Sequence, residues 1–432
     1  MIYFSGTEKV KLNKKMDVIF ITDNTNNLNT KELFNKCKKI CKKTYCFNVI
    51  DEFYDFIKTQ KYTKKTNICF IGNEEDNLEY SSLLNFMIYY KEEYKKITTH
   101  MKKFNKTIYK DNNSIINESL EYFKEANKDG KCIRGTLINL GYKTHKKDNY
   151  SLPLASAYEA FETAILIHDD IIDNADLRRN MPTIHKKYMS DFKDYKQDNT
   201  PYHLALCIGD IGFYYVNDYI VSKYRKDKNL ARLLNYYNEI SIDTIKGEIL
   251  DVYLPYIEKN DKSHRLLEDD ILKIYKLKTA KYTIIGPFVL GMILSGAKSN
   301  EINEMTKILE PIGISFQIKD DILGIMSTTK EIGKPIYSDI EEFKQTILYS
   351  YIKINKKEYL EDLLNYYGTK VNEEQLKEVQ RIIIESGSLE YAQNKMNELF
   401  EYSKEKINKS KLNKEIKSIL IGFIKYLELR KK

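Results

Sequence analysis

Two short segments of the chain end an apolar run with paired aspartates. In the first, IHDDIID, Asp169 and Asp173 are four residues apart, with Asp170 between them. In a helix this spacing places Asp169 and Asp173 on one face, roughly 6 Å apart, and turns Asp170 about 100° around the axis. Two carboxylates at that distance repel each other unless a cation lies between them. The segment predicts a cation site, against the alternative of a solvated acidic helix end.

The second segment, FQIKDDILGI, repeats this pattern with Asp320 and Asp321, after an apolar stretch that begins at Pro311. Two apolar helices that each end in paired aspartates predict a shared, oxygen-rich pocket. Mg²⁺ prefers a few carboxylates together with water and phosphate oxygens, so magnesium suits such a pocket.

Basic residues beside glycine, aspartate or threonine complete the set. They are Lys131 and Arg134 in DGKCIRG, Arg178 and Arg179 after the first motif, Lys278 before Thr279, Lys334 in GKP and Lys344 in KQT. A single lysine in a chain with 70 Lys and Arg is normally a solvated surface charge. The spacing favours function, because each base lies in an otherwise apolar helical segment and arginine suits bidentate binding of diphosphate.

Composition limits the fold class. The 432 residues include 42% hydrophobic and 12% aromatic residues, but only 17 glycines and 7 prolines. These values argue against a disordered or an all-β chain. The net charge of +8 is a small surplus over 62 acidic residues, so it does not indicate nucleic acid as a partner. We expect a large, mostly helical protein.

Nothing in the sequence predicts a membrane span or a signal peptide. The longest uncharged stretch, residues 282–297, is shorter than the roughly 20 residues that a spanning helix needs, and it contains glycine and proline. We therefore expect a soluble, intracellular protein of the cytoplasm or an organelle matrix, with the compartment open. The cysteines at 37, 41 and 46 have no histidine near them before His100, which favours reduced thiols over a zinc site.

Hydrophobic periodicity changes near residue 78. Residues 1–78 alternate apolar runs, at 18–21 and 68–71, with lysine-rich amphipathic stretches, which predicts two strands and one or two helices. We expect a small N-terminal extension there, of α/β type and unknown role. Residues 79–432 carry apolar residues at helical spacing and predict an all-α domain. Within it, Ser151 and Pro153 mark the start of a helix that should run to about Asp173.

Taken together and in order, GKCIR, IHDDIIDNADLRR, KTA, FQIKDD and GKPIYSD resemble the motifs of the trans-isoprenyl diphosphate synthases. This family includes the farnesyl, geranylgeranyl and longer polyprenyl diphosphate synthases, and the resemblance covers about residues 80–432. It implies a large helical barrel of the isoprenoid synthase type and a homodimer. It also implies a prenyltransferase that condenses isopentenyl diphosphate with an allylic diphosphate to an all-trans polyprenyl diphosphate.

The resemblance implies three Mg²⁺ ions, bound together with the allylic diphosphate. Asp169, Asp173 and Asp320 match the direct metal ligands of the family, and Asp170 and Asp321 match supporting carboxylates. These aspartates act as ligands in such a reaction, not as a general acid and base.

The substrate contacts follow in the same way. The residues that resemble the allylic diphosphate clamp are Arg178, Lys278 and Lys334, with Lys344 as a further substrate-binding base. Those that resemble the isopentenyl diphosphate site are Lys131, Arg134 and Arg179, joined there by Glu162. Lys278, Thr279 and Gln317 would act at the reacting carbon, where the last two supply dipoles to the carbocation.

Product length in this family is limited by side chains below the first aspartate motif on the same helix. Ile165, Ala164 and Phe161 stand four, five and eight residues before Asp169. Small Ala164 leaves the first turn beneath the reacting carbon open, which favours a product of about twenty carbons or longer. Phe161 is either the next obstacle or an ordinary core residue.

Three residues depart from the family pattern. Glu162 stands where His or Gln is common, Glu248 where Gln is frequent, and Gly324 where the second motif often has a third aspartate. These departures leave open an inactive or regulatory partner subunit of another synthase. A class I terpene cyclase is a further alternative, which Asp320 and Asp321 argue against.

Overall fold

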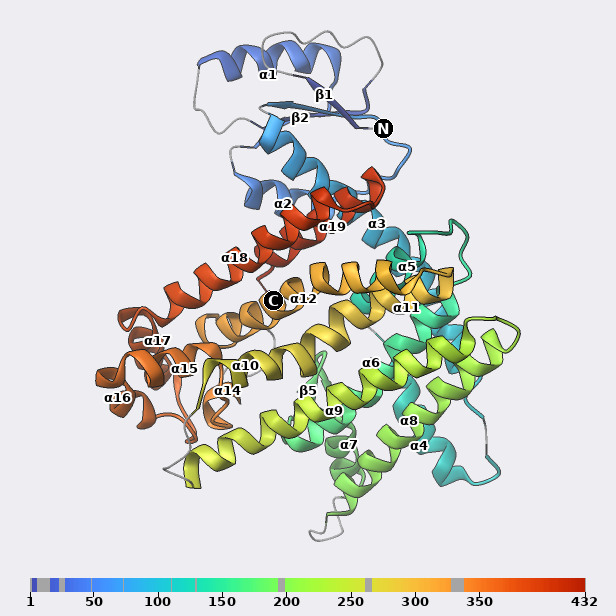
Figure 1. The fold of residues 1–432 in the computed structure, drawn as a ribbon, viewed down its shortest axis with the longest axis vertical. Coiled ribbons are helices and arrows are strands. Elements are labelled where there is room, and N and C mark those ends of the chain that lie inside the picture. The colour runs from blue at the N-terminus through green and yellow to red at the C-terminus, as the bar shows by residue number, and fades with distance from the viewer. Residues whose placement is uncertain are drawn as a thin grey trace. The chain divides into compact units, whose positions relative to one another are not determined.

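Strands alternate with helices in the N-terminal part of the chain, and most of the remaining elements are helices (Figure 1). The computed structural model describes residues 2–5, 16–22, 28–47, 49–72, 74–109, 111–128, 130–192, 199–260, 266–327 and 338–431. The chain divides into two units, residues 1–93 with 404–430 and residues 94–403 with 431–432. The predicted domain boundary between residues 78 and 79 stays a prediction.

The first unit contains a parallel sheet. Its strands β1 (Ile2–Ser5), β2 (Val18–Thr22), β3 (Thr44–Phe47) and β4 (Ile68–Gly72) lie in the order β1-β4-β2-β3. Strands β2 and β4 are fully buried, as expected for apolar runs in the middle of a parallel sheet. The helices of this unit are α1 (Leu28–Ile40), α2 (Ile50–Thr59), the first part of α3 (Glu74–Asn105), the end of α18 (Ser388–Lys409) and α19 (Lys414–Leu429). The small α/β region expected from the sequence is confirmed.

Three cysteines of the first unit behave as small apolar residues. Cys37, Cys41 and Cys69 pack in a buried cluster with Ile19 and Ile71. Burial raises the pKa of the Cys69 thiol to about 11, so this thiol stays protonated at neutral pH.

Apart from a two-stranded hairpin, the regular elements described in the second unit are helices. After the end of α3 come α4 (Ser114–Ala126), α5 (Ile133–Tyr142), α6 (Leu152–Ile172), the hairpin β5 (Leu177–Arg178) and β6 (Met181–Pro182), α7 (Ile184–Asp191), α8 (Thr200–Tyr224) and α9 (Leu230–Asn260). Next come α10 (Glu268–Ile274), the π-helix η1 (Tyr275–Ile285), α11 (Gly286–Ser295) and α12 (Ser299–Met326). The last are α14 (Ser338–Glu341), α15 (Ile347–Asn355), the 3₁₀ turn η2 (Lys357–Tyr359), α16 (Leu360–Leu364), α17 (Glu373–Glu385) and α18 (Ser388–Lys409).

Three helix contacts position the site residues. Helix α6 packs along α8, and η1 packs against both α9 and α12. Helices α9 and η1 approach so closely that a Cβ on Gly247 would lie 2.4 Å from the backbone nitrogen of Lys278. Only glycine permits this distance, and the approach places the following α9 residues beside Lys278. A π-helical segment such as η1 is uncommon and frequently marks a functional site.

One continuous helical segment among the described residues, Glu268–Ser295, is long and apolar enough to cross a membrane. In its most apolar window, 83% of the residues are buried inside the protein. Core helices pass the same test of length and composition, so this segment belongs to the core of the second unit.

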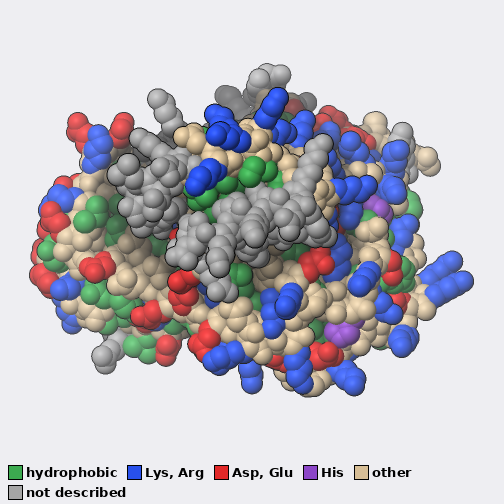
Figure 2. Space-filling view, turned by 90° about the horizontal axis from the view of Figure 1, so that it is seen from above, with side chains coloured by type: hydrophobic (Ala, Val, Ile, Leu, Met, Phe, Trp, Pro, Cys, Tyr) green, Lys and Arg blue, Asp and Glu red, His purple; other side chains and the backbone are tan. Residues whose placement is uncertain are grey.

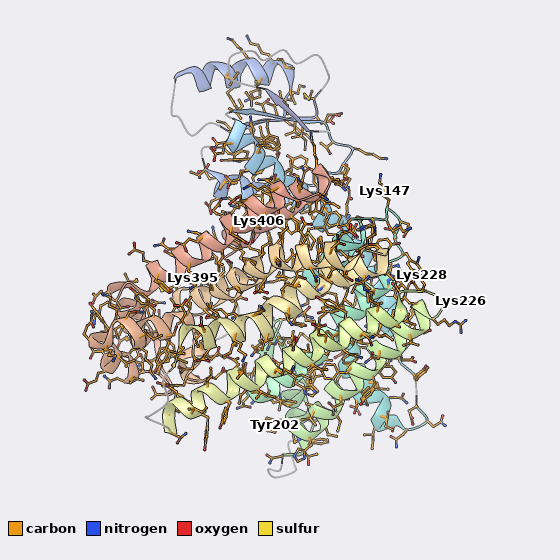
Figure 3. All side chains as sticks on the ribbon, in the orientation of Figure 1. Lys147, Tyr202, Lys226, Lys228, Lys395 and Lys406 are labelled. Carbon is orange, nitrogen blue, oxygen red and sulfur yellow. The ribbon has the colours of Figure 1, made fainter. Side chains whose placement is uncertain are left out.

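The charged surface is mixed in sign. Over the described side chains of the face drawn in Figure 2, basic and acidic groups are interspersed. Lys147, Lys226 and Lys228 are exposed, and their side chains extend outward from the helical unit (Figure 3). Lys278 and Lys344 differ from these lysines, because their ammonium groups lie among carboxylates.

Candidate active site

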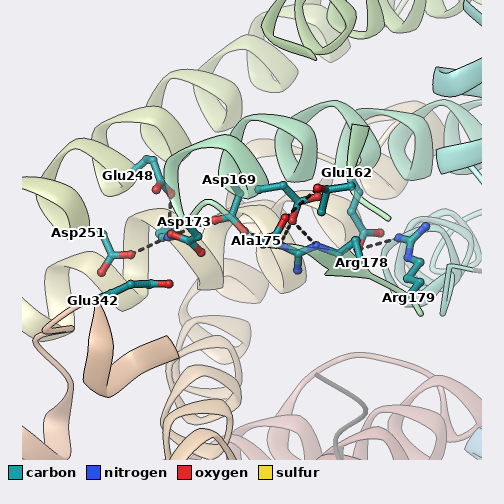
Figure 4. A network of polar contacts seen from close by, with 12 residues as sticks. Glu162, Asp169, Asp173, Ala175, Arg178, Arg179, Glu248, Asp251 and Glu342 are labelled. Carbon is teal, nitrogen blue, oxygen red and sulfur yellow. Dashed lines mark hydrogen bonds and ion pairs between the residues drawn. The ribbon is translucent and has the colours of Figure 1, made fainter. Parts of the chain in front are cut away.

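The first aspartate motif forms the end of α6. The helix begins at Leu152, with proline in its first turn, and Asp173 is its C-terminal cap, as the sequence predicted. Arg178 reaches back from the hairpin, with its Nη2 2.9 Å from Asp169 Oδ2 and its Nε 2.7 Å from Asp170 Oδ1 (Figure 4). Burial raises the pKa of Asp170 to about 6, although Arg178 opposes that shift. The arginine therefore neutralises two acids of this motif.

Lys278 faces the same acids from η1. Its Nζ lies 3.5 Å from Asp169 Oδ1, 2.8 Å from Glu248 Oε2 and 2.6 Å from Asp251 Oδ2 (Figure 4). Glu248, one of the departures from the family pattern, is thus an ion-pair partner of Lys278. Sequence reasoning did not single out Asp251, although its position three residues after Glu248 in KGEILD places both acids on one face of α9.

Lys344 enters the site from the segment after α14. Its Nζ lies 3.7 Å from Asp173 Oδ2, 3.6 Å from Asp339 Oδ1 and 3.1 Å from Glu342 Oε2. Burial raises the pKa of Glu342, and the nearby Lys344 opposes that shift. The pKa of Glu342 is raised overall to about 7. Neither Asp339 nor Glu342 was assigned a role from the sequence, although Asp339 is the last residue of the GKPIYSD motif.

The second aspartate motif is connected to η1 by hydrogen bonds. Thr279 Oγ1 donates to Gln317 Oε1 at 2.5 Å, and Gln317 Nε2 donates to Asp321 Oδ1 at 2.8 Å. The hydroxyl of Tyr275, which the sequence reasoning missed, also donates to Asp321. Burial raises the pKa of Asp321. Thr279 and Gln317 are thus neighbours, and Asp320 precedes Asp321 at the same end of α12.

The predicted isopentenyl site contains a paired carboxylate. Arg134 Nη1 lies 2.7 Å from Glu162 Oε1, and Arg179 Nη2 lies 3.6 Å from the same oxygen. Arg134 also donates to Thr283 Oγ1 at 2.9 Å, and its guanidinium lies 4.2 Å from the ring centre of Tyr282. Glu162 is therefore paired with two arginines and is not an isolated charge.

Glu159 lies beside Glu162, one helical turn earlier on α6. Its Oε1 accepts a hydrogen bond from the backbone N–H of Gly135 at 2.6 Å. Burial and the neighbouring Glu162 raise the pKa of Glu159 to about 8. Burial also opposes ionisation of Glu162, but Arg134 and Arg179 outweigh it and lower the pKa of that group. At neutral pH the pair therefore carries mainly the Glu162 charge.

Strained backbone marks the same residues. Among the described residues, the non-glycine positions with positive φ are Cys132, Asn174, Arg179, Asn180 and Phe343. Each is a predicted site residue or lies within two positions of one. Arg179 and Asn180 are the two central residues of the β5–β6 hairpin, where positive φ is typical of the turn. Strain of this kind persists where the surrounding structure requires it, often at functional sites.

Two further bases were predicted from the sequence. Lys131 is exposed just before α5, whereas Arg134 of the same motif is mostly buried against Glu162. Lys334 lies outside the described residues.

The predicted chain-length residues differ in what they contact. The ring of Phe161 lies 4.9 Å from that of Tyr237 and 5.8 Å from that of Phe213, in a cluster that also holds Tyr158 and Tyr282. These rings come from α6, α8, α9 and η1, so Phe161 points into the middle of the bundle. Ala164 instead faces α8. A Cβ built on Gly212 of that helix would lie 2.9 Å from the Cβ of Ala164. Ile165 is half-buried.

The donor set fits the predicted magnesium site. Carboxylates from the ends of α6 and α12 are hard oxygen ligands, and the ammonium groups of Lys278 and Lys344 already lie against Asp169 and Asp173, where positive charge is required. Within the described residues, no three His, Cys, Asp or Glu side chains are placed to hold one ion by themselves. Mg²⁺ commonly binds one or two carboxylates and completes its shell with water and phosphate oxygens.

Comparison with known proteins identifies the family. The polyprenyl synthetase family model matches residues 113–383. A geranylfarnesyl diphosphate synthase of Aeropyrum pernix is 29% identical over 278 residues, which are 63% of this chain and 82% of that protein. A short chain isoprenyl diphosphate synthase of Methanocaldococcus jannaschii is 29% identical over 270 residues, 61% of this chain and 74% of the relative.

The fold agrees with that of a solved structure. The geranylgeranyl pyrophosphate synthase of Corynebacterium glutamicum, complexed with isoprenyl diphosphate and magnesium, superimposes with a TM-score of 0.69 at 23% identity. The match covers 79% of this chain and 99% of that one. The isoprenoid synthase fold predicted from the motifs is therefore confirmed. The chain belongs to the polyprenyl synthetase family of prenyltransferases.

Proposed function

We propose that this chain is itself an active, Mg²⁺-dependent synthase that condenses isopentenyl diphosphate with an allylic diphosphate to an all-trans polyprenyl diphosphate. The observation that carries the proposal is the convergence of Asp169, Asp173, Arg178, Lys278 and Lys344, from four separate segments, on one acidic and basic cluster. An inactive partner subunit would have no need of buried charges in this arrangement, which cost free energy to maintain.

The chemistry follows from these groups. The allylic carbon–oxygen bond breaks, and Arg178, Lys278 and Lys344 stabilise the negative charge that develops on the leaving diphosphate. Magnesium, held by Asp169, Asp173 and Asp320, would add Lewis-acid stabilisation of the same charge. The double bond of isopentenyl diphosphate attacks the allylic cation to form the new carbon–carbon bond, and the released diphosphate takes the proton that is lost.

Two polar side chains suit the cation. Thr279 and Gln317 are hydrogen-bonded to each other and present dipoles without a charged nucleophile that would trap the cation. The aromatic cluster around Phe161 gives the growing hydrocarbon tail an apolar surface. No nucleophilic side chain is needed at any step.

A product analysis tests the proposal. Purified protein with Mg²⁺, isopentenyl diphosphate and farnesyl diphosphate should form a longer all-trans diphosphate, and chelation of Mg²⁺ should stop the reaction. A terpene cyclase would instead release a hydrocarbon from one substrate. A chain that makes nothing alone, but restores or alters the activity of a second synthase, would be a partner subunit.

We further propose a product of about twenty carbons or longer, because α6 has no phenylalanine or tyrosine in the first turn below Asp169, where Ala164 packs against α8. The first aromatic side chain on α6 beneath the aspartates is Phe161, about 12 Å along the helix axis at 1.5 Å per residue. Tyr237, which meets Phe161 from α9, would share in closing this end of the tail site.

Glu162 is expected to weaken the binding of isopentenyl diphosphate, because its carboxylate already neutralises Arg134 at 2.7 Å. Replacement by glutamine, Glu162→Gln, keeps the size but removes the charge. The Michaelis constant for isopentenyl diphosphate should fall about tenfold, a difference of about 1.4 kcal/mol, while that for the allylic substrate stays unchanged.

A matched variant controls for this interpretation. Glu248→Gln makes the same change beside Lys278, on the side of the allylic diphosphate. It should change only the Michaelis constant for the allylic diphosphate. Steady-state kinetics with each substrate varied in turn measures both. A rise in the isopentenyl constant in Glu162→Gln would mean that Glu162 mainly holds Arg134 and Arg179 in place.

We also propose a homodimer formed through α9. Apolar side chains follow this helix at alternating three- and four-residue spacing, each between 49% and 62% exposed: Ile242, Ile245, Ile249, Val252, Tyr253 and Tyr256. This spacing is typical of a seam between two packed helices, and exposed apolar surface of this kind marks an interface. A second copy of the chain is the occupant that the family resemblance implies.

The dimer is tested by mass. Sedimentation should give twice 51.0 kDa for the wild type and the single-chain mass for the double variant Ile245→Glu/Ile249→Glu. Leu78→Glu changes an equally exposed apolar residue in the first unit and should leave the dimer intact. A monomeric wild type at micromolar concentration would contradict the proposal.

A further inference from the structure

Two buried carboxyl groups lie together at the predicted isopentenyl site. Glu159 is 3% exposed, and the side chain of Glu162, one turn later on α6, is 12% exposed. The two side chains are hydrogen-bonded to each other. A carboxylate has no hydrogen to donate, so this bond requires a proton on one of the two groups. The pair is therefore a carboxylic acid bonded to a carboxylate.

The other contacts of the pair show which residue holds the proton. Glu159 Oε1 accepts the N–H of Gly135 at 2.6 Å, and Glu159 Oε2 is buried without a donor from the described residues outside the pair. Glu162 Oε1 lies 2.7 Å from Arg134 Nη1 and 3.6 Å from Arg179 Nη2, and these positive charges favour its ionised form. The proton is thus on Glu159, which donates it to Glu162.

The carboxylate of Glu162 takes the place of an anionic ligand. Arg134 comes from α5 and Arg179 from the β5–β6 hairpin, and both guanidinium groups converge on one oxygen of Glu162. Guanidinium groups bind phosphate oxygens in the same way. A diphosphate that binds these two arginines brings further negative charge next to Glu162. Because like charges repel strongly in a buried site, that carboxylate then gains affinity for a proton.

The remaining titratable and charged groups that face the pair from the described residues are Arg178 of the hairpin, Cys132 before α5 and Tyr282 of η1, with Tyr158 of α6 beside Arg134. Burial raises the pKa of the Cys132 thiol and of both phenols, so these three groups are neutral at physiological pH. Arginine stays charged throughout. Protons gained or lost in this cluster near neutral pH therefore belong to the two glutamates.

We propose that the Glu159–Glu162 pair is an internal anion of the isopentenyl site, which the substrate diphosphate displaces from Arg134 and Arg179 while the pair takes up one proton from the solvent. Glu159 is a positioning residue in this scheme, because it acts through Glu162 and through the N–H of Gly135. The proposal rests on the proposed function, since it presupposes that isopentenyl diphosphate binds these arginines. It adds to that function a dependence of substrate binding on pH.

The direction of this dependence follows from the proton uptake. Binding that takes up one proton weakens about tenfold for each unit by which the pH rises. The affinity for isopentenyl diphosphate should therefore fall as the pH rises through neutrality. Burial raises the pKa of Glu159 to about 8, so above this pH Glu159 also ionises. The second negative charge should hold the arginines more tightly and weaken binding further.

Isothermal titration calorimetry with isopentenyl diphosphate as the probe counts the protons. The titrations are made without Mg²⁺, so that the metal-dependent allylic site stays empty, and in two buffers that differ in their heat of ionisation. Protons exchanged by the ligand itself contribute equally to every variant. At about pH 7.5 the wild type should take up about one proton more than Glu162→Gln, whose amide cannot titrate. Equal numbers of protons would overturn the proposal.

Glu159→Gln tests the second residue of the pair. Its amide can still accept from Gly135 and donate to Glu162, but it cannot ionise. The variant should bind isopentenyl diphosphate like the wild type at neutral pH and about tenfold more tightly than the wild type at about pH 9, one unit above the pKa of Glu159. A pH profile identical to that of the wild type would refute the role of Glu159. Should Glu162→Gln misfold, this profile decides alone.

A matched control uses a carboxylate outside this site. Glu310 of α12 pairs with Lys276 at 2.8 Å, and Glu310→Gln should match the wild type in both the proton number and the pH profile. If Glu310→Gln instead changes them as Glu162→Gln and Glu159→Gln do, the pH dependence does not come from the Glu159–Glu162 pair, and the proposal fails.

Infrared spectroscopy of the free protein separates this inference from the proposed function. The C=O band of a protonated carboxyl group should be present in the wild type at neutral pH and reduced in Glu159→Gln, whether or not a substrate binds. If isopentenyl diphosphate binds but this difference is absent, only the shared proton is refuted. If the difference is present but isopentenyl diphosphate does not bind, the proposed function is refuted, and the coupling of binding to protons with it.

Discussion

Asp169→Ala and Asp320→Ala should each lower Mg²⁺-dependent turnover by a factor of roughly 100 or more, because each removes charge stabilisation worth several kcal/mol at the leaving diphosphate. The helical fold should persist, since both carboxylates lie at helix ends and neither is buried in the apolar core. Initial rates at saturating substrates, with Mg²⁺ varied, measure the effect, and circular dichroism checks the fold.

Asp176→Ala provides the matched control for this loss. Asp176 follows the same motif, but its side chain is 76% exposed and pairs with Lys186 at 3.1 Å. Removal of an exposed ion pair changes little, so turnover should stay within about twofold of the wild type. Near-normal activity in both Asp169→Ala and Asp320→Ala would refute the assignment of the metal ligands.

Phe161→Ala should shift the product to a longer chain by at least one isoprene unit. The ring of Phe161 is the first aromatic group on α6 beneath Asp169, and it meets Phe213 and Tyr237 from the facing helices. Its removal opens space in the direction in which the tail grows. Product diphosphates are measured by hydrolysis to alcohols and chromatography, at matched substrate ratios for wild type and variant.

The control variants for Phe161→Ala have to distinguish an effect on the space for the product tail from an effect of lost protein stability. Truncation of a buried phenylalanine costs about 3–5 kcal/mol, so Phe161→Leu serves as a milder variant with the same expected direction. Phe104→Ala truncates another fully buried ring, which packs on Tyr219, and should leave the product length unchanged. Farnesyl diphosphate as the sole wild-type product would contradict the open first turn. Unchanged lengths in both Phe161 variants would place the end of the tail site on another helix.

The spacing of residue types along the sequence predicted several individual helices and strands correctly. The helix that carries the first motif begins and ends where Ser151, Pro153 and Asp173 predict, because capping and proline preferences act over a few neighbouring residues. Strands β2 and β4 were predicted from their apolar runs, whereas β1 and β3 were not, since four residues carry too little periodic signal. Within the sheet, the strand order depends on pairings between residues far apart in the chain.

The sequence alone determined the family, the helical fold class and the two aspartate motifs, because these depend on residue types at short, ordered spacings. Only the tertiary structure decided which charges meet. The pairing of Glu162 with Arg134, of Asp251 with Lys278, and the position of Asp339 beside Gly324 join segments that are far apart in sequence. Such contacts depend on how the helices pack against one another, and helix packing is set by the whole core, which no local pattern encodes.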